Sequence, residues 1–182
     1  MRTKGIVVGV LAISSALLMV AAVSASERHT AVRTRPECTI NGTDQGEDIQ
    51  GTSGRDVICA GGGADFVESL EGNDVVFAGP GQDLVDAGPG ADTVRGEDGS
   101  DILFGQEGRD DLFGGAGRDD VRGGLGRDRI LGGAGGDFCL SAIDDHPGDR
   151  VNGGPGHDRG DHDPGDHVSS VEDLLDFFCF AE

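Results

Sequence analysis

The chain of 182 residues holds 34 acidic residues against 14 Lys and Arg, which gives a formal net charge of −20 at pH 7. This charge excludes a nucleic-acid-binding protein, because phosphates would be repelled rather than neutralised. With 34 glycines, no Trp and no Tyr, the chain also has too few large apolar residues for an ordinary enzyme core. Two classes remain: a disordered chain, or a repeat whose turns need glycine and whose charge needs a cation.

Residues 1–25 have the pattern of a secretory signal peptide. Arg2 and Lys4 precede an uncharged run over 5–23, and small residues surround an expected cleavage point after Ala25. The alternative is an uncleaved anchor, since a run of this length can just span a bilayer, but its serines and glycines disfavour that interpretation. Cleavage predicts a secreted, extracellular protein with no stable membrane anchor.

The segment 51–140 repeats every nine residues without a slip, and this repeat decides the fold. Each unit has an aspartate, a glycine two residues before it and an apolar residue two residues after it. The aspartates are Asp56, Asp65, Asp74, Asp83, Asp92, Asp101, Asp110, Asp119, Asp128 and Asp137. The apolar residues are Ile58, Val67, Val76, Val85, Val94, Leu103, Leu112, Val121, Ile130 and Cys139. Outside the segment the period is looser: Asp48 lies eight residues before Asp56, and Asp149 and Asp158 follow a three-residue insertion.

The unit from Gly114 to Arg122, with the sequence GGAGRDDVR, resembles the G-G-x-G-x-D-x-U-x motif of the RTX, or haemolysin-type, calcium-binding nonapeptide repeats. The resemblance covers 51–140 strictly, and 42–50 and 144–161 loosely. It implies a small secreted bacterial member of that family, without a catalytic domain, and a right-handed parallel β-roll that binds calcium.

The residues of the unit agree with an all-β fold. Glycines at the first, second and fourth positions suit a tight turn, and the last three residues suit a short strand whose middle side chain points inward. Two units then make one coil of 18 residues, so the array becomes a parallel two-sheet β-solenoid. We expect an N-terminal cap with a degenerate first repeat at 26–50, the ten-unit roll at 51–140, and degenerate repeats with a C-terminal cap at 141–182.

The C-terminal cap is expected to contain a short helix. Ser169-Ser170-Val171-Glu172 has the pattern of a capping box, and a stretch rich in Leu and Phe follows it. Gly160 stands where its unit should carry an apolar residue, which predicts that this unit does not complete a strand. Cys139 is predicted as the inward residue of the last regular unit.

Stacked turns require a cation in this arrangement. Neighbouring strands lie ~4.8 Å apart, so the aspartates of successive coils repel one another, and each close pair costs about 1 kcal/mol even in water. Carboxylates together with turn carbonyls form an all-oxygen site, which suits calcium better than zinc, copper or magnesium. The ten repeat aspartates predict eight sites between coils, and the weaker candidates Asp48, Asp149 and Asp158 could raise the number to eleven.

The four cysteines predict two disulfides, because export leads to an oxidising compartment. We expect Cys38–Cys59 and Cys139–Cys179, since each of these bonds joins a flanking segment to the nearer end of the array. The other two pairings would tie together positions many coils apart. A site of four thiolates is disfavoured, because no C-x-x-C pair is present.

Other patterns give weaker signals. The His- and Asp-rich segment 144–167 suits either a transition-metal site or a solvent-facing end of the array, and we favour the latter. No catalytic motif occurs, so we expect no enzyme activity. Two alternatives stay open: an adhesive or matrix protein that uses the roll as a spacer, with Phe66, Leu84 and Ile102 as an outward apolar row, and a remnant of a repeat-bearing hydrolase or toxin. Calcium ions are the expected partner, and no macromolecular partner follows from the sequence.

Overall fold

The computed structural model describes residues 35–142, 144 and 147–174. The chain divides into two compact units, 1–35 and 36–182. The first unit, with the predicted signal peptide, lies almost entirely outside the described residues. In the described part of the chain, no helix is long and apolar enough to cross a membrane.

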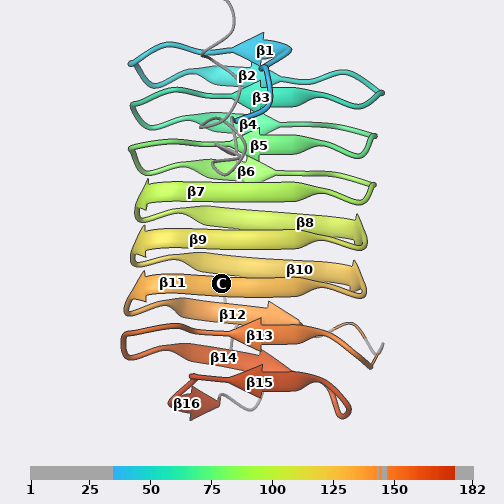
Figure 1. Cartoon of the computed structure of the whole chain (residues 1–182), viewed down its shortest axis with the longest axis vertical. Helices are drawn as coiled ribbons and strands as arrows, with labels where there is room; N and C mark the ends of the chain where they lie inside the picture. The colour runs from blue at the N-terminus through green and yellow to red at the C-terminus, as the bar shows by residue number, and fades with distance from the viewer. Residues whose placement is uncertain (1–34, 143, 145–146, 175–182) are drawn as a thin grey trace, which may run out of the picture. The chain divides into compact units, whose positions relative to one another are not determined.

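The described residues between 36 and 174 form a parallel β-solenoid of two sheets, which confirms the predicted fold class (Figure 1). Odd-numbered strands make one eight-stranded sheet and even-numbered strands make the other. The described strands are β1 (Ile40–Asn41), β2 (Asp48–Gln50), β3 (Val57–Cys59), β4 (Phe66–Glu68), β5 (Val75–Phe77), β6 (Leu84–Asp86), β7 (Thr93–Gly99), β8 (Ile102–Gly108), β9 (Asp111–Gly117), β10 (Asp120–Gly126), β11 (Arg129–Gly135), β12 (Phe138–Ala142), β13 (Arg150–Asn152), β14 (Arg159–His162), β15 (His167–Ser169) and β16 (Asp173–Leu174).

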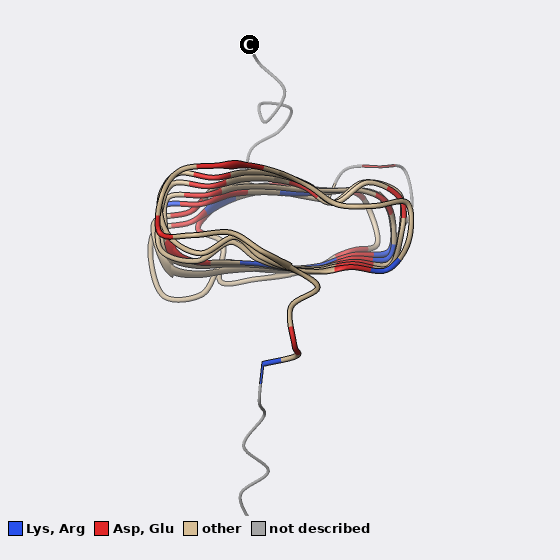
Figure 2. Ribbon diagram, turned by 90° about the horizontal axis from the view of Figure 1, so that it is seen from above, with Lys and Arg blue, Asp and Glu red and all other residues tan. Residues whose placement is uncertain are grey.

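The register confirms the coil of 18 residues. Val67 pairs with Val85, Val85 pairs with Leu103, and each coil therefore places its inward side chain directly above the next. These inward side chains are fully buried and form one continuous core between the two sheets: Ile58, Val67, Val76, Val85, Val94, Leu103, Leu112, Val121 and Ile130. Seen along the stack, acidic residues recur at the same places of successive coils (Figure 2).

The end of the regular array differs from the prediction. Val121 in β10 pairs with Leu140 in β12, not with Cys139, because the register shifts by one residue after Asp120. Cys139 is the extra residue of this β-bulge, with a φ of 56°. The inward residue of the last unit is thus Leu140, which joins the core, although Cys139 is buried as well.

Two predictions for the C-terminal cap are wrong. Gly160 lies in β14 and pairs with Leu140, because backbone pairing alone completes a strand that lacks an inward side chain. The capping box does not form: Ser169 ends β15, and its carbonyl accepts a hydrogen bond from the Gly153 N–H (3.1 Å). The segment continues the coil because Val168 and Val171 pack against the core. The described residues contain no helix, and the rest of the predicted helix, 175–180, lies outside them.

The predicted Cys38–Cys59 disulfide is present, with a Cα–Cα distance of 5.9 Å. It joins the chain ahead of β1 to the end of β3, and closing a loop of 21 residues stabilises a fold by about 3 kcal/mol. Cys139 is also disulfide-bonded. Its predicted partner, Cys179, lies outside the described residues, so that pairing stays a prediction.

Candidate metal centre

The repeat aspartates form two columns, one at each turn edge of the solenoid. In every column, one carboxylate oxygen accepts a hydrogen bond from the backbone N–H of the aspartate one coil earlier. The Asp56 N–H donates to Asp74 Oδ1 (2.8 Å), and the Asp101 N–H donates to Asp119 Oδ1 (3.0 Å). The bond recurs without interruption along both columns, at 2.7–3.1 Å. Each carboxylate therefore holds the preceding turn in place.

In every column aspartate except Asp56, the second carboxylate oxygen has no protein partner. In the described part of the chain, Oδ2 is buried and accepts no hydrogen bond in Asp65, Asp74, Asp83, Asp92, Asp101, Asp110, Asp119, Asp128, Asp137, Asp149 and Asp158. A buried carboxylate oxygen without a partner costs several kcal/mol. A regular column of such oxygens fits a bound cation, which supplies the missing interaction.

The raised pKa values of the column aspartates also indicate that the protein does not supply enough positive charge beside their carboxylates. Burial is the largest cause that raises the pKa of Asp101 and Asp128 to about 7 and that of Asp110 to about 8. The hydrogen bond from the preceding coil lowers these pKa values, and the neighbouring carboxylates of the same column raise them. The ionised forms thus lack stabilisation by the protein itself.

Any cation site here needs backbone carbonyls or water in addition to the carboxylates. In the described residues, no three His, Cys, Asp or Glu side chains gather closely enough to hold a metal ion by themselves. Carbonyl oxygens do lie beside the unpartnered carboxylates. For example, the position that a β-carbon on Gly96 would take is within 3 Å of both Asp101 Oδ2 and the Gly114 carbonyl oxygen, so these two oxygens are close neighbours. Carboxylate and carbonyl oxygens together are the donor set that calcium takes.

The first coil departs from this pattern. Asp56 Oδ2 accepts hydrogen bonds from the N–H and the hydroxyl of Thr52 (2.7 and 2.8 Å). The hydrogen bond from the Thr52 N–H is the largest cause that holds the pKa of Asp56 below its usual value. Asp56 is therefore satisfied within its own turn, unlike the aspartates that follow.

The structure places Asp48 away from the column and brings other acidic residues into it. Asp48 is exposed in β2 and pairs with Phe66, whereas the N–H of the preceding Glu47 donates to Asp65 Oδ1 (2.9 Å). The shortened spacing between Asp48 and Asp56 was the only sequence signal of this shift. At the other end, Asp149 and Asp158 continue the columns as predicted positions of the repeat.

Two further acidic residues extend the columns beyond the predicted set. The Asp149 N–H donates to Asp166 Oδ1 (3.1 Å), and the Asp158 N–H donates to Glu172 Oε2 (2.7 Å). Spacings of 17 and 14 residues hid both from the nine-residue period. His157, His162 and His167 in the same segment are exposed and do not assemble into a metal cluster.

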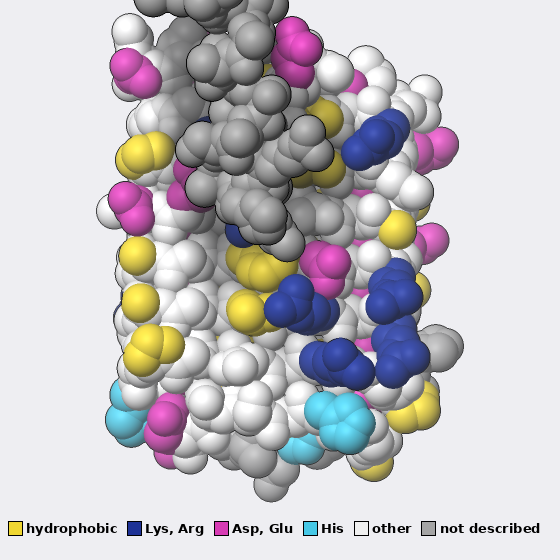
Figure 3. Space-filling model, in the orientation of Figure 1, with side chains coloured by type: hydrophobic (Ala, Val, Ile, Leu, Met, Phe, Trp, Pro, Cys, Tyr) yellow, Lys and Arg dark blue, Asp and Glu magenta, His cyan; other side chains and the backbone are white. Residues whose placement is uncertain are grey.

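The outer surface carries other features. Phe66, Leu84 and Ile102 line up on adjacent strands, as predicted, and Ile102 is 40% exposed. Arginine side chains gather on the face shown in Figure 3, and the guanidinium groups of Arg95 and Arg129 lie over the ring of Phe113, at 4.5 and 5.3 Å from its centroid. These residues make the surface mixed rather than uniformly acidic.

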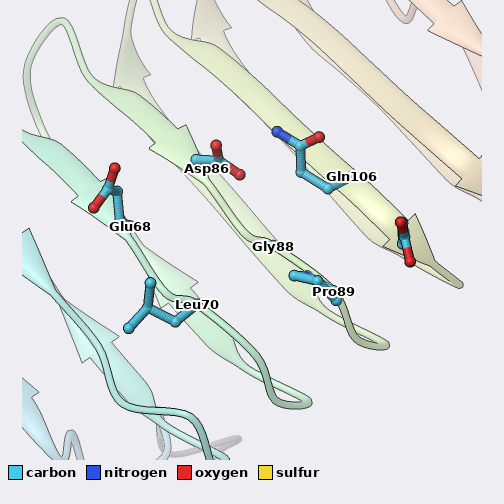
Figure 4. A pocket seen from close by; sticks show the side chains of 7 residues that line it. Glu68, Leu70, Asp86, Gly88, Pro89 and Gln106 are labelled. Atoms are coloured by element: carbon cyan, nitrogen blue, oxygen red, sulfur yellow. The ribbon is translucent and has the colours of Figure 1, made fainter.

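A surface hollow of about 310 Å³ lies over the turns near β6 and β8 (Figure 4). Two of its residues, Leu70 and Gln106, have positive φ values of 72° and 77° on either side of Gly88, which has a φ of 80°. A leucine in this conformation is strained by about 1–2 kcal/mol. The remaining lining residues are Glu68, Asp86, Pro89 and Glu107, so the hollow carries three carboxylates.

The fold and the columns together define a class of protein: a parallel β-solenoid whose turns present regularly spaced carboxylate and carbonyl oxygens to cations. The profile of the RTX calcium-binding nonapeptide repeat matches four times, at residues 41–76, 69–103, 77–112 and 104–139. The chain belongs to this family. A search of the curated proteins gives no match.

Proposed function

We propose that this protein is a secreted, non-catalytic calcium-binding repeat protein that folds when it binds calcium. The observation that carries the proposal is the series of buried Oδ2 atoms without a protein partner. Membership of a repeat family that binds calcium supports the identity of the ion, and that family is typically structural rather than catalytic. The proposal that the protein is exported rests on the signal-peptide pattern of residues 1–25. Export would bring the chain to a calcium-rich medium.

Equilibrium dialysis of the protein lacking 1–25 tests the calcium claim directly. Several calcium ions per chain are expected at millimolar free calcium, because extracellular modules bind calcium with dissociation constants of about 10⁻⁴–10⁻³ M. Magnesium at the same concentration is the control, and it should bind much more weakly because it gives up its water reluctantly. Less than one calcium ion per chain at these concentrations would refute the proposed function.

Two aspartates at different places in one column should differ in their effect on calcium-dependent folding. Asp128→Ala removes the acceptor for the Asp110 N–H (2.9 Å) and a buried Oδ2 without a partner. We expect this substitution to raise the calcium concentration at which half of the protein is folded by about 10-fold or more. Loss of a metal ligand, or of a group that orients a ligand, has an effect of this size on metal affinity. Asp56→Ala is the matched control, because its Oδ2 is bonded to Thr52; its midpoint should stay within about 2-fold of wild type. Circular dichroism at 218 nm measures both midpoints, and equal shifts would contradict the prediction.

A further inference from the structure

One part of the outer surface has an excess of positive charge, although the chain as a whole is strongly acidic. Four exposed arginines surround a hollow of about 220 Å³ where β9, β11 and β13 begin: Arg109, Arg127, Arg129 and Arg150. Arginine side chains gather on the lower right of the face that Figure 3 draws. The only acidic residues in the lining are Asp111 and Asp128, so the hollow has a local excess of two positive charges.

The strand register places these arginines next to one another. Arg129 in β11 is the direct partner of Arg150 in β13, and neighbouring strands lie about 4.8 Å apart. Arg109 and Arg127 directly precede two aspartates that are linked across one coil, so they occupy the same position in successive coils. Like charges directly opposite each other on neighbouring strands are destabilising. An anion between the guanidinium groups would remove this repulsion.

The protein neutralises these arginines only in part. The Arg129 guanidinium lies 4.0 Å from the Asp111 carboxylate, and both side chains are about half exposed, so this ion pair contributes little. Asp128 is buried, and its Oδ1 already accepts a backbone hydrogen bond from the preceding coil. Within the described residues, the side chains of Arg109 and Arg150 make no hydrogen bond or ion pair. Their charges are therefore available to a ligand.

Contacts with the protein hold two of the four arginines in position. Arg127 Nε donates to the Gly148 carbonyl oxygen (2.9 Å), which leaves its terminal N–H groups for another acceptor. The Arg129 guanidinium lies over the ring of Phe113, 5.3 Å from its centroid. Planar guanidinium groups bind oxyanions through pairs of N–H donors. Because the protein already orients these groups, less conformational freedom is lost when an anion binds.

A second hollow, of about 210 Å³, adjoins the first and has no acidic residue in its lining. Arg129 and Arg150 line both hollows. In the second hollow, Asn152, His167 and Ser169 supply further polar groups that can donate hydrogen bonds. The pair formed by Arg129 and Arg150 thus lies at the junction of two hollows, with carboxylates on one side only.

We propose that the pair Arg129 and Arg150 binds a sulfate or phosphate group, either as the free ion or as part of a small extracellular ligand. A doubly charged oxyanion matches the local excess of two positive charges, whereas a carboxylate would match only one. The net charge of −20 does not prevent this binding, because charges more than about 8 Å away are largely screened at physiological ionic strength. A nucleic acid stays excluded, because its many phosphates would extend beyond the arginines.

Titration of sulfate into ¹⁵N-labelled protein lacking 1–25 tests the proposal, with millimolar calcium present and folding confirmed by circular dichroism. Nuclear magnetic resonance follows the Nε–H signals of the arginine side chains, and those of Arg129 and Arg150 are expected to shift until they saturate. Arg150→Gln should weaken sulfate binding by about 10-fold or more, because hydrogen bonds from a charged donor are lost. Arg150→Lys should recover only part of the affinity, because an ammonium group lacks the paired donors.

Glucose 6-sulfate distinguishes the two sources of the group. Tighter binding than that of free sulfate supports a sulfate or phosphate group carried by a larger ligand that also occupies the second hollow. Equal or weaker binding supports a site for the free ion.

Arg122→Gln is the matched control. It removes the same charge from the other sheet, where Arg122 already donates two hydrogen bonds to the Asp120 carboxylate (2.9 and 3.0 Å). Sulfate binding should stay within about 2-fold of wild type, because this charge lies outside the screening distance of the hollow. The absence of a saturable shift in wild type, or an equal loss of affinity in Arg122→Gln and Arg150→Gln, would overturn the anion site. Neither result would affect the proposed function, which equilibrium dialysis with calcium tests separately.

Discussion

Chelation of calcium at pH 7.5 is expected to convert the solenoid from β structure to a largely unfolded chain. Without calcium, the buried Oδ2 atoms of both columns have no partner within the described protein, so the fold must hold either unpaired buried charges or carboxyl groups that have taken up a proton. Each buried unpaired carboxylate costs several kcal/mol, while the whole stability of a domain is only ~5–15 kcal/mol. A few empty turns therefore suffice to cancel the stability supplied by the apolar core.

Far-ultraviolet circular dichroism during titration with EGTA measures this transition, with the disulfides reduced so that they do not hold residual structure. The β signal should disappear on chelation and return when excess calcium is added. Magnesium in place of calcium is the control and should restore little of it. A spectrum that chelation leaves unchanged would show that the fold does not depend on the ion.

Protonation of the column carboxyl groups at low pH should partly substitute for calcium in stabilising the fold. Burial raises the pKa of Asp92 and Asp137 to about 6, of Asp101 and Asp128 to about 7, and of Asp110 to about 8. The pKa of the folded state lies above the usual value of 3.8, so folding takes up protons. The resulting stability is fully present below about pH 4 and is lost as the pH rises towards 8. The calcium-free protein should therefore be more structured at pH 5.5 than at pH 8.

Thermal melts of calcium-free protein between pH 5.5 and 8.5 measure this dependence, and a melting temperature that rises with pH would contradict it. Asp110→Asn is the informative variant, because an amide of the same shape does not ionise. Without calcium it should be more stable than wild type at pH 8, and its advantage should shrink towards pH 5.5. With calcium the order should reverse, because the amide is a weaker ligand than the carboxylate.

The nine-residue period predicted most of the fold, because one aspartate and one apolar residue per unit set both the turn and the inward row. Prediction failed where the period was broken. At Cys139 and Leu140, the period selects Cys139 for the inward row, but the bulge brings Leu140 there instead. At Glu47 and Asp48, the residue type pointed to Asp48, but strand pairing selects Glu47, which keeps the nine-residue spacing, for the column.

The candidate site was harder to predict in detail than the fold. The sequence identified the column aspartates, but it did not show that Asp56 is satisfied by Thr52 while the later aspartates keep an oxygen without a partner. Nor did it show Asp166 and Glu172, which reach the columns from a shortened last coil. These differences depend on which backbone groups lie beside each carboxylate, and the repeat pattern does not encode that.

The hydrogen bonds of the columns all run in one direction along the chain. The Asp65 N–H donates to Asp83, and the Asp83 N–H donates to Asp101 (both 2.9 Å). Each turn is therefore completed by a residue that the ribosome adds later: 18 positions later in the regular array, and 21 positions later across the insertion. The two columns can close only when Asp166 and Glu172 have been synthesised. A chain released before these residues would end in turns whose donors have no carboxylate to bind.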